Sequence, residues 1–147
     1  MRTSFERLLL GDTSGVMLMP EVTSGPYYIS GEVIRTNLVE DQPGVPLTLD
    51  VQIVDVDTCE PVPGIWLDFW QANATGVYSG VVGTLEYPEA NMSLPNGDPN
   101  DSENSKATFL RGLTATDEAG VATVETIFPG HYELYVEVCG LKLAGRG

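Results

Sequence analysis

The amino-acid sequence predicts an all-β protein, an antiparallel β-sandwich with a long central loop. Three observations support this fold class: apolar and polar residues alternate over short segments, turn-forming residues recur at close spacing, and no segment has the pattern of a long helix. With 147 residues, the chain has the size of one domain. We expect an N-terminal arm over residues 1–19 and a single β-sandwich domain over residues 20–147.

Two strand patterns stand in the first half of the chain. Over residues 47–53 the apolar side chains fall on one face and the polar ones on the other, which predicts a half-buried strand. Prolines and a glycine in residues 57–64 then predict a turn. A second strand is expected at residues 65–70, where Trp66 and Trp70 share a face and fill a core or cover a sheet.

The second half begins with a change of composition. Residues 81–106 are rich in Asn, Asp, Pro, Gly and Ser, which predicts a long surface loop. Strand pattern resumes at residues 108–112, a turn is expected at 116–120, and a further strand at 121–128. Residues 131–138 show the clearest alternation of the chain.

The charge balance excludes several classes of function. Seven basic against twenty-one acidic residues give a formal net charge of -14. Such a chain repels nucleic acid and anionic lipid, so we expect neither as a partner. No apolar run approaches the roughly 20 residues that are needed to cross a bilayer, which predicts a soluble protein with no membrane contact.

Other features concern the compartment. Asn73, Asn91 and Asn100 each begin a triplet that fits the N-glycosylation pattern, which predicts a secreted, extracellular glycoprotein. The N-terminal apolar stretch is too short for a signal peptide, so we expect a leader that has been removed or is absent from this version of the sequence. Cys59 and Cys139 leave two alternatives open, a disulfide or two free thiols.

Several short motifs, in order along most of the chain, carry a family resemblance. They include Gly-Val-Tyr-Ser-Gly around Tyr78 and Phe-Pro-Gly-His-Tyr ending at Tyr132. The sequence resembles the intradiol ring-cleavage dioxygenases, the family of catechol, hydroxyquinol and protocatechuate dioxygenases, and particularly their secreted fungal members. The similar segments are residues 20–28, 44–50, 59–63, 68–71, 76–80, 108–112 and 126–132.

The resemblance implies cleavage of a catechol between its two hydroxyl-bearing carbons, with O2 and a ferric ion held by two tyrosines and two histidines. Tyr78 and Tyr132 resemble the tyrosine ligands, and hard phenolate oxygens suit Fe(III). The resemblance also implies that Tyr132 leaves the metal when substrate binds and accepts a proton. The segments that resemble the lining of the substrate pocket contain Gly25, Pro26, Tyr27 and Val77. The expected partners are a small aromatic diol and O2, and both a monomer and a homo-oligomer are compatible with the sequence.

The sequence departs from the family after Tyr132. The secreted relatives continue with a Gly-Arg pair and a His-x-His pair, whereas residues 136–147 contain no histidine and His131 is the only histidine of the chain. We therefore expect a truncated or altered C-terminus, which leaves enzymatic activity open. The alternative is a non-catalytic β-sandwich that serves as an accessory or binding module. Residues 116–120 and 129–138 resemble such transthyretin-like (prealbumin-like) or carboxypeptidase-regulatory-like modules.

Overall fold

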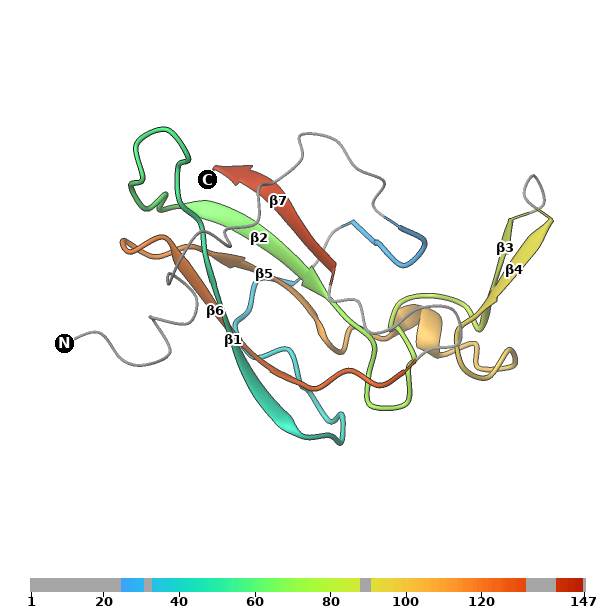
Figure 1. Cartoon of the computed structure of the whole chain (residues 1–147). Coiled ribbons are helices and arrows are strands. Elements are labelled where there is room, and N and C mark those ends of the chain that lie inside the picture. Colours follow the sequence, from blue (N-terminus) through green and yellow to red (C-terminus); the bar gives the residue numbers. More distant parts are fainter. Residues whose placement is uncertain (1–24, 31–32, 88–90, 132–139, 147) are drawn as a thin grey trace.

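The computed structural model describes residues 25–30, 33–87, 91–131 and 140–146 (Figure 1). Strands make up nearly all of the regular structure in these ranges, together with a short 3-10 helix at Asn104–Lys106. The predicted all-β fold class is confirmed. The strands are β1 (Pro46–Gln52), β2 (Ile65–Trp70), β3 (Thr84–Tyr87), β4 (Met92–Pro95), β5 (Arg111–Ala115), β6 (Val121–Ile127) and β7 (Gly140–Arg146).

Two antiparallel sheets form the body of the domain. One has the strand order β5-β2-β7, and the other pairs β1 with β6. Residues of β1 alternate between exposed and half-buried, as expected for a strand with one face on the core. The core between the sheets contains Leu67 and Phe69 from β2 and Ala122 and Val124 from β6. The predicted sandwich is therefore present.

A segment before β1 joins the two sheets. Ile34 bridges Leu113 of β5 in parallel, and Asn37 bridges Glu125 of β6 in parallel. A Cβ atom added at Gly112 would lie 2.6 Å from Leu38 Cδ2 and 3.1 Å from Arg35 Cγ, so only a glycine lets this segment pack so close to β5. Residues 33–38 thus tie β5 to β6, and they fix the turn that precedes β5.

The predicted long loop at residues 81–106 is not structureless. It contains the β3–β4 hairpin, which pairs only with itself among the described strands and extends away from the two larger sheets (Figure 1). The 3-10 helix follows it. Asn96 and Asn104 lie in this segment, but they are buried rather than on the surface. Both side chains make hydrogen bonds to the backbone of the loop that contains Tyr78.

A second difference concerns the strand predicted at residues 108–112. Residues 109 and 110 form a turn, and β5 begins only at Arg111. Leu110 has a φ of 57° and its amide donates to the carbonyl of Leu38 at 2.7 Å, so a tertiary contact sets its backbone. The strands predicted at residues 47–53, 65–70 and 121–128 agree with the structure to within one residue at each end.

Several predictions fall outside the described residues. These are the N-terminal arm at residues 1–19, the alternation over residues 132–138, and Cys139. Cys59 is exposed, directly follows a turn and has a free thiol. Within the described ranges, no helix has the length and apolar character that a membrane crossing requires.

Candidate functional site

Tyr78 lies in the loop between β2 and β3, with 3% of its surface exposed. The ring of Tyr27 stacks on the ring of Tyr78, with centroids 4.3 Å apart and planes inclined by 9°. Trp70 packs into the same cluster, because alternation along β2 turns it away from the sandwich core that Phe69 enters. The phenol proposed as an iron ligand is thus buried among aromatic side chains.

The backbone on both sides of Tyr78 is held by side-chain amides. The amide of Tyr78 donates to Asn96 Oδ1 at 2.8 Å, and Asn96 Nδ2 donates back to the Tyr78 carbonyl at 2.9 Å. Asn104 Nδ2 donates to the carbonyls of Tyr78 and Val81, each at 2.8 Å. Both asparagines come from the connection between β4 and β5. That connection therefore holds the Tyr78 loop in one conformation.

The beginning of the loop is anchored to a distant segment. Gly130 donates its amide to the carbonyl of Asn73 at 2.8 Å. A Cβ atom at Gly130 would collide with the carbonyl of Ala74, so a glycine is required for this approach. The chain that leads to His131 therefore passes beside the loop that carries Tyr78. Tyr132 itself lies outside the described residues, and its position near Tyr78 remains a prediction.

A buried arginine connects the two stacked tyrosine segments. Arg111 is 2% exposed, and its Nη2 donates to the carbonyl of Tyr27 at 2.6 Å. Its Nε donates to the carbonyl of Ser79 at 3.0 Å and to Ser79 Oγ at 3.1 Å. Ser79 Oγ in turn donates to the carbonyl of Phe109 at 2.6 Å. One guanidinium thus holds residues from both sides of the aromatic stack.

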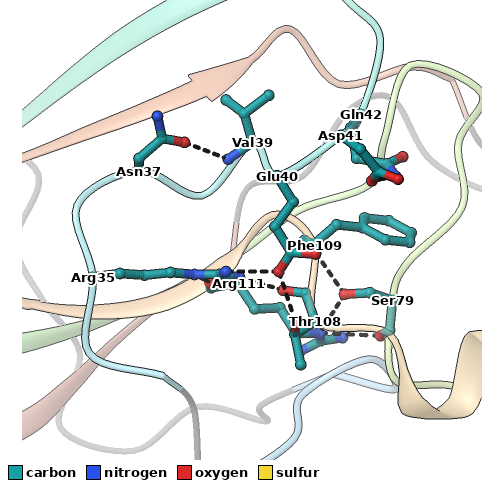
Figure 2. Close-up of polar contacts among 10 residues, drawn as sticks. All are labelled: Arg35, Asn37, Val39, Glu40, Asp41, Gln42, Ser79, Thr108, Phe109 and Arg111. Atoms are coloured by element: carbon teal, nitrogen blue, oxygen red, sulfur yellow. Dashed lines mark hydrogen bonds and ion pairs between the residues drawn. The ribbon is translucent and has the colours of Figure 1, made fainter.

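Arg35 holds the turn before β5 from a more exposed position. Its Nε donates to the carbonyl of Arg111 at 2.9 Å, its Nη2 to the carbonyl of Thr108 at 2.5 Å, and its Nη1 to Glu40 Oε1 at 2.6 Å. Thr108 Oγ1 donates to the same carboxylate oxygen at 2.6 Å. Figure 2 shows Arg35, Glu40 and Thr108 converging, with Ser79 and Arg111 meeting beside them.

The structure brings together only some of the residues predicted for the site. Tyr27, predicted for the substrate pocket, packs directly on Tyr78, and its hydroxyl donates to the carbonyl of Pro95 at 3.3 Å. Gly25 is exposed and Pro26 is half-buried, and both directly precede Tyr27 in the chain. Val77 is half-buried beside Gly97. The role of these four residues in binding substrate remains a prediction.

The donor set fits a ferric ion only in part. Tyr78 offers a phenol oxygen, and phenolates are hard donors that suit Fe(III). In the described ranges, no group of three or more His, Cys, Asp and Glu side chains is placed to hold a metal ion. The one histidine of the sequence, His131, is exposed. Tyr78 thus fits one phenolate position of an iron site, and the sequence contains no histidine pair.

Three supporting residues carry no role in the sequence-based prediction: Arg111, Asn96 and Asn104. The sequence could have indicated that Arg111 has a structural role, because it is a single cation directly after the apolar residues Phe109 and Leu110. A cation that enters a core needs hydrogen-bond acceptors. The asparagines give no such signal, because the composition around them is that of an ordinary surface loop.

A β-sandwich with a buried tyrosine on a braced loop is the class of protein that these observations define. The family whose description is Dioxygenase matches residues 22–146. Together with the similarity to solved dioxygenase structures, this match shows that the chain belongs to the family of intradiol ring-cleavage dioxygenases. Members of this family act on catechol-type substrates with O2 and generally depend on Fe(III).

Solved structures agree with this assignment. An intradiol ring-cleavage dioxygenase from Tetranychus urticae is 34% identical with a TM-score of 0.68, and the match covers 90% of this chain and 64% of that one. The dioxygenase domain of a carbohydrate-binding fusion protein from Streptomyces sp. SirexAA-E is 29% identical with a TM-score of 0.59, covering 87% and 68%. The 3-chlorocatechol 1,2-dioxygenase from Rhodococcus opacus 1CP is 30% identical with a TM-score of 0.53, covering 77% and 38%.

The chain therefore spans 64% of the length of the Tetranychus urticae enzyme. Comparison with curated proteins found no match. The similarity to secreted fungal members in particular remains a prediction.

Proposed function

We propose that the protein is an intradiol dioxygenase that cleaves catechol-type rings between the two hydroxylated carbons with O2 and Fe(III), and that Tyr78 and Tyr132 supply its phenolate ligands. The observation that carries this proposal is the burial of Tyr78 on a loop whose backbone is bonded on both sides by Asn96. An exposed strand tyrosine needs no such bracing, whereas a metal ligand gains from a fixed position.

The residues of the chain would divide the work as follows. Ferric iron, when bound, supplies Lewis-acid character that favours loss of the substrate's hydroxyl protons. Tyr78 and Tyr132 would hold the metal, and the phenolate oxygen of Tyr132 would accept a proton from the substrate. The substrate ring would be bound by Gly25, Pro26, Tyr27 and Val77.

The missing histidine pair has a consequence for affinity. Two phenolates leave most coordination positions of a ferric ion to water, so we expect this chain to bind iron weakly and to exchange it easily. A non-catalytic β-sandwich module is the second candidate function. The exposure of the only histidine, His131, favours it over a complete iron site within this chain.

Ferric iron titration of the purified chain separates the two functions. A tyrosinate–iron centre gives a visible charge-transfer band, which we expect in the wild type and expect to be lost in Tyr78→Phe. Tyr28→Phe is the matched control, because Tyr28 is next to Tyr27 but sets its ring edge-on against Trp70, with centroids 5.3 Å apart. Absence of a band in the wild type would favour the accessory module. Oxygen uptake with catechol then tests activity.

We also propose that the protein is secreted and glycosylated. Asn91 and Asn100 support this proposal, since both are exposed and both begin an acceptor triplet. Asn73 differs from them: it is half-buried, and its Nδ2 donates to Gln42 Oε1 at 3.0 Å.

A further inference from the structure

We propose that Arg111 is a positioning residue that holds Tyr27 stacked on Tyr78. By fixing Tyr78, Arg111 would also fix a phenolate ligand of iron, and this second effect rests on the proposed function. The effect of Arg111 on the aromatic stack does not depend on iron. Arg111 is assigned this role because its side chain bonds to the segments of both stacked rings, at the carbonyl of Tyr27 and at Ser79, the residue directly after Tyr78.

The shape of the guanidinium explains why an arginine stands here. Its donors lie in one plane and point in fixed directions, so the bond from Nη2 to Tyr27 and the bonds from Nε to Ser79 set the relative position of the two segments. A lysine keeps the charge, but its donors are all on one ammonium nitrogen at the end of a flexible side chain. It cannot hold both segments in the same way.

The backbone before Arg111 is shaped to direct this side chain inward. Leu110 is fully buried with a φ of 57°, a conformation that is unfavourable for a leucine and persists only where surrounding contacts impose it. The contact that imposes it is the hydrogen bond from the Leu110 amide to the carbonyl of Leu38, at 2.7 Å. Such strain is concentrated at functional sites.

The burial of the Arg111 guanidinium also supports a positioning role. Desolvating a guanidinium is costly, and an apolar side chain of similar volume would fill the space without that cost. An apolar side chain would leave the carbonyls of Tyr27 and Ser79 without these donors, so the two segments would lose their common support. We infer that the cation is kept for the position it gives to the rings.

Tyrosine nitration by tetranitromethane on the metal-free chain tests the proposal, with peptide mass spectrometry as the readout. In the wild type we expect Tyr27 and Tyr78, which are 4% and 3% exposed, to be protected. In Arg111→Lys we expect nitration of both to rise by at least about tenfold through local opening, while far-ultraviolet circular dichroism shows a folded chain. Protection of both rings in folded Arg111→Lys would overturn the proposal.

Arg35→Lys is the control for a merely structural effect. Arg35 braces the same turn but bonds to Thr108, Glu40 and the carbonyl of Arg111. We expect it to lower stability while both rings stay protected, and equal nitration in the two lysine variants would contradict a specific role for Arg111.

If Arg111→Lys does not fold, Ser79→Ala decides, since it removes the hydroxyl that accepts from Arg111 Nε. Nitration of Tyr78 should rise severalfold, and unchanged protection would count against the proposal.

Iron gives a second, separate readout. If the chain binds ferric iron, Arg111→Lys should shift the tyrosinate charge-transfer band, and Arg35→Lys should not. If no variant and no wild type shows a band, the proposed function fails, and the nitration result still decides the role of Arg111.

Discussion

The side chain of Asn96 pairs with the backbone of Tyr78 in the way that a neighbouring strand pairs with a strand in a sheet. Its amide group both accepts from the Tyr78 N–H and donates to the Tyr78 carbonyl, so a buried loop without a strand partner keeps its polar groups paired. Asparagine suits this task because its side chain carries the donor and the acceptor of a peptide group. Aspartate has nearly the same shape but lacks the donor.

Asn96→Ala tests this role. Loss of the amide leaves the N–H of Tyr78 buried without its acceptor, so we expect a loss of about 1–3 kcal/mol in the free energy of unfolding, measured by urea denaturation. Asn100→Ala is the control, because Asn100 is exposed and bonds only locally to Asp98, and it should cost no more than about 0.5 kcal/mol. Equal losses in the two variants would refute the bracing role.

At the scale of elements, the strands that follow from the sequence are those in which alternation and burial coincide. β1 and β6 are predicted because burial alternates along each of them. The β3–β4 hairpin is missed, since its strands have four residues each and stand in a polar segment. The turn at Leu110 is missed as well, because Leu38, distant in sequence, sets its backbone.

The candidate site also has some features that local sequence predicts and others that distant contacts determine. Tyr78 is recognisable from its local motif, whereas its stacking on Tyr27 depends on a fold that joins segments far apart in the chain. Local sequence is enough to single out Tyr78 as the candidate ligand. Its surroundings come from tertiary contacts such as those of Arg111, whose bonding partners no local pattern identifies.

Gly112→Ala tests the junction between the two sheets. The added methyl group would meet Leu38 at 2.6 Å and the Val33 carbonyl at 3.3 Å, so residues 33–38 must move away from β5. We expect a loss of about 1–3 kcal/mol in the free energy of unfolding, as for other overpacked core sites. Hydrogen exchange should show faster exchange at the amides of Leu38 and Leu113, which bond across this junction. Wild-type exchange at both would show that the junction tolerates a side chain.

At the scale of the whole molecule, the acidic surface agrees with the proposed chemistry. With a net charge of -14, the protein repels anions and has no attraction for a neutral diol. Ring opening of such a diol gives a dicarboxylate, which this charge would drive away from the protein. The charge therefore favours solubility and product release over capture of substrate.

The three acceptor triplets are placed differently on the molecule, which leads to a prediction about glycosylation. Asn91 lies at the turn between β3 and β4, and Asn100 lies in the exposed segment that follows β4. Asn73 begins the loop that carries Tyr78, and its Oδ1 accepts from the amides of Thr75 and Val77 at 3.0 Å each. A glycan at Asn73 would disturb this turn.

We therefore expect folded protein, secreted from a eukaryotic host behind an added leader, to carry glycans at Asn91 or Asn100 and none at Asn73. Peptide mass spectrometry before and after enzymatic glycan removal measures the occupancy at each position. Asn73→Gln supplies the control: it deletes the acceptor, so the glycan mass of the secreted protein should stay the same, while stability should fall because the turn loses its bonds. Folded protein with a glycan at Asn73 would show that the Tyr78 loop does not depend on this side chain.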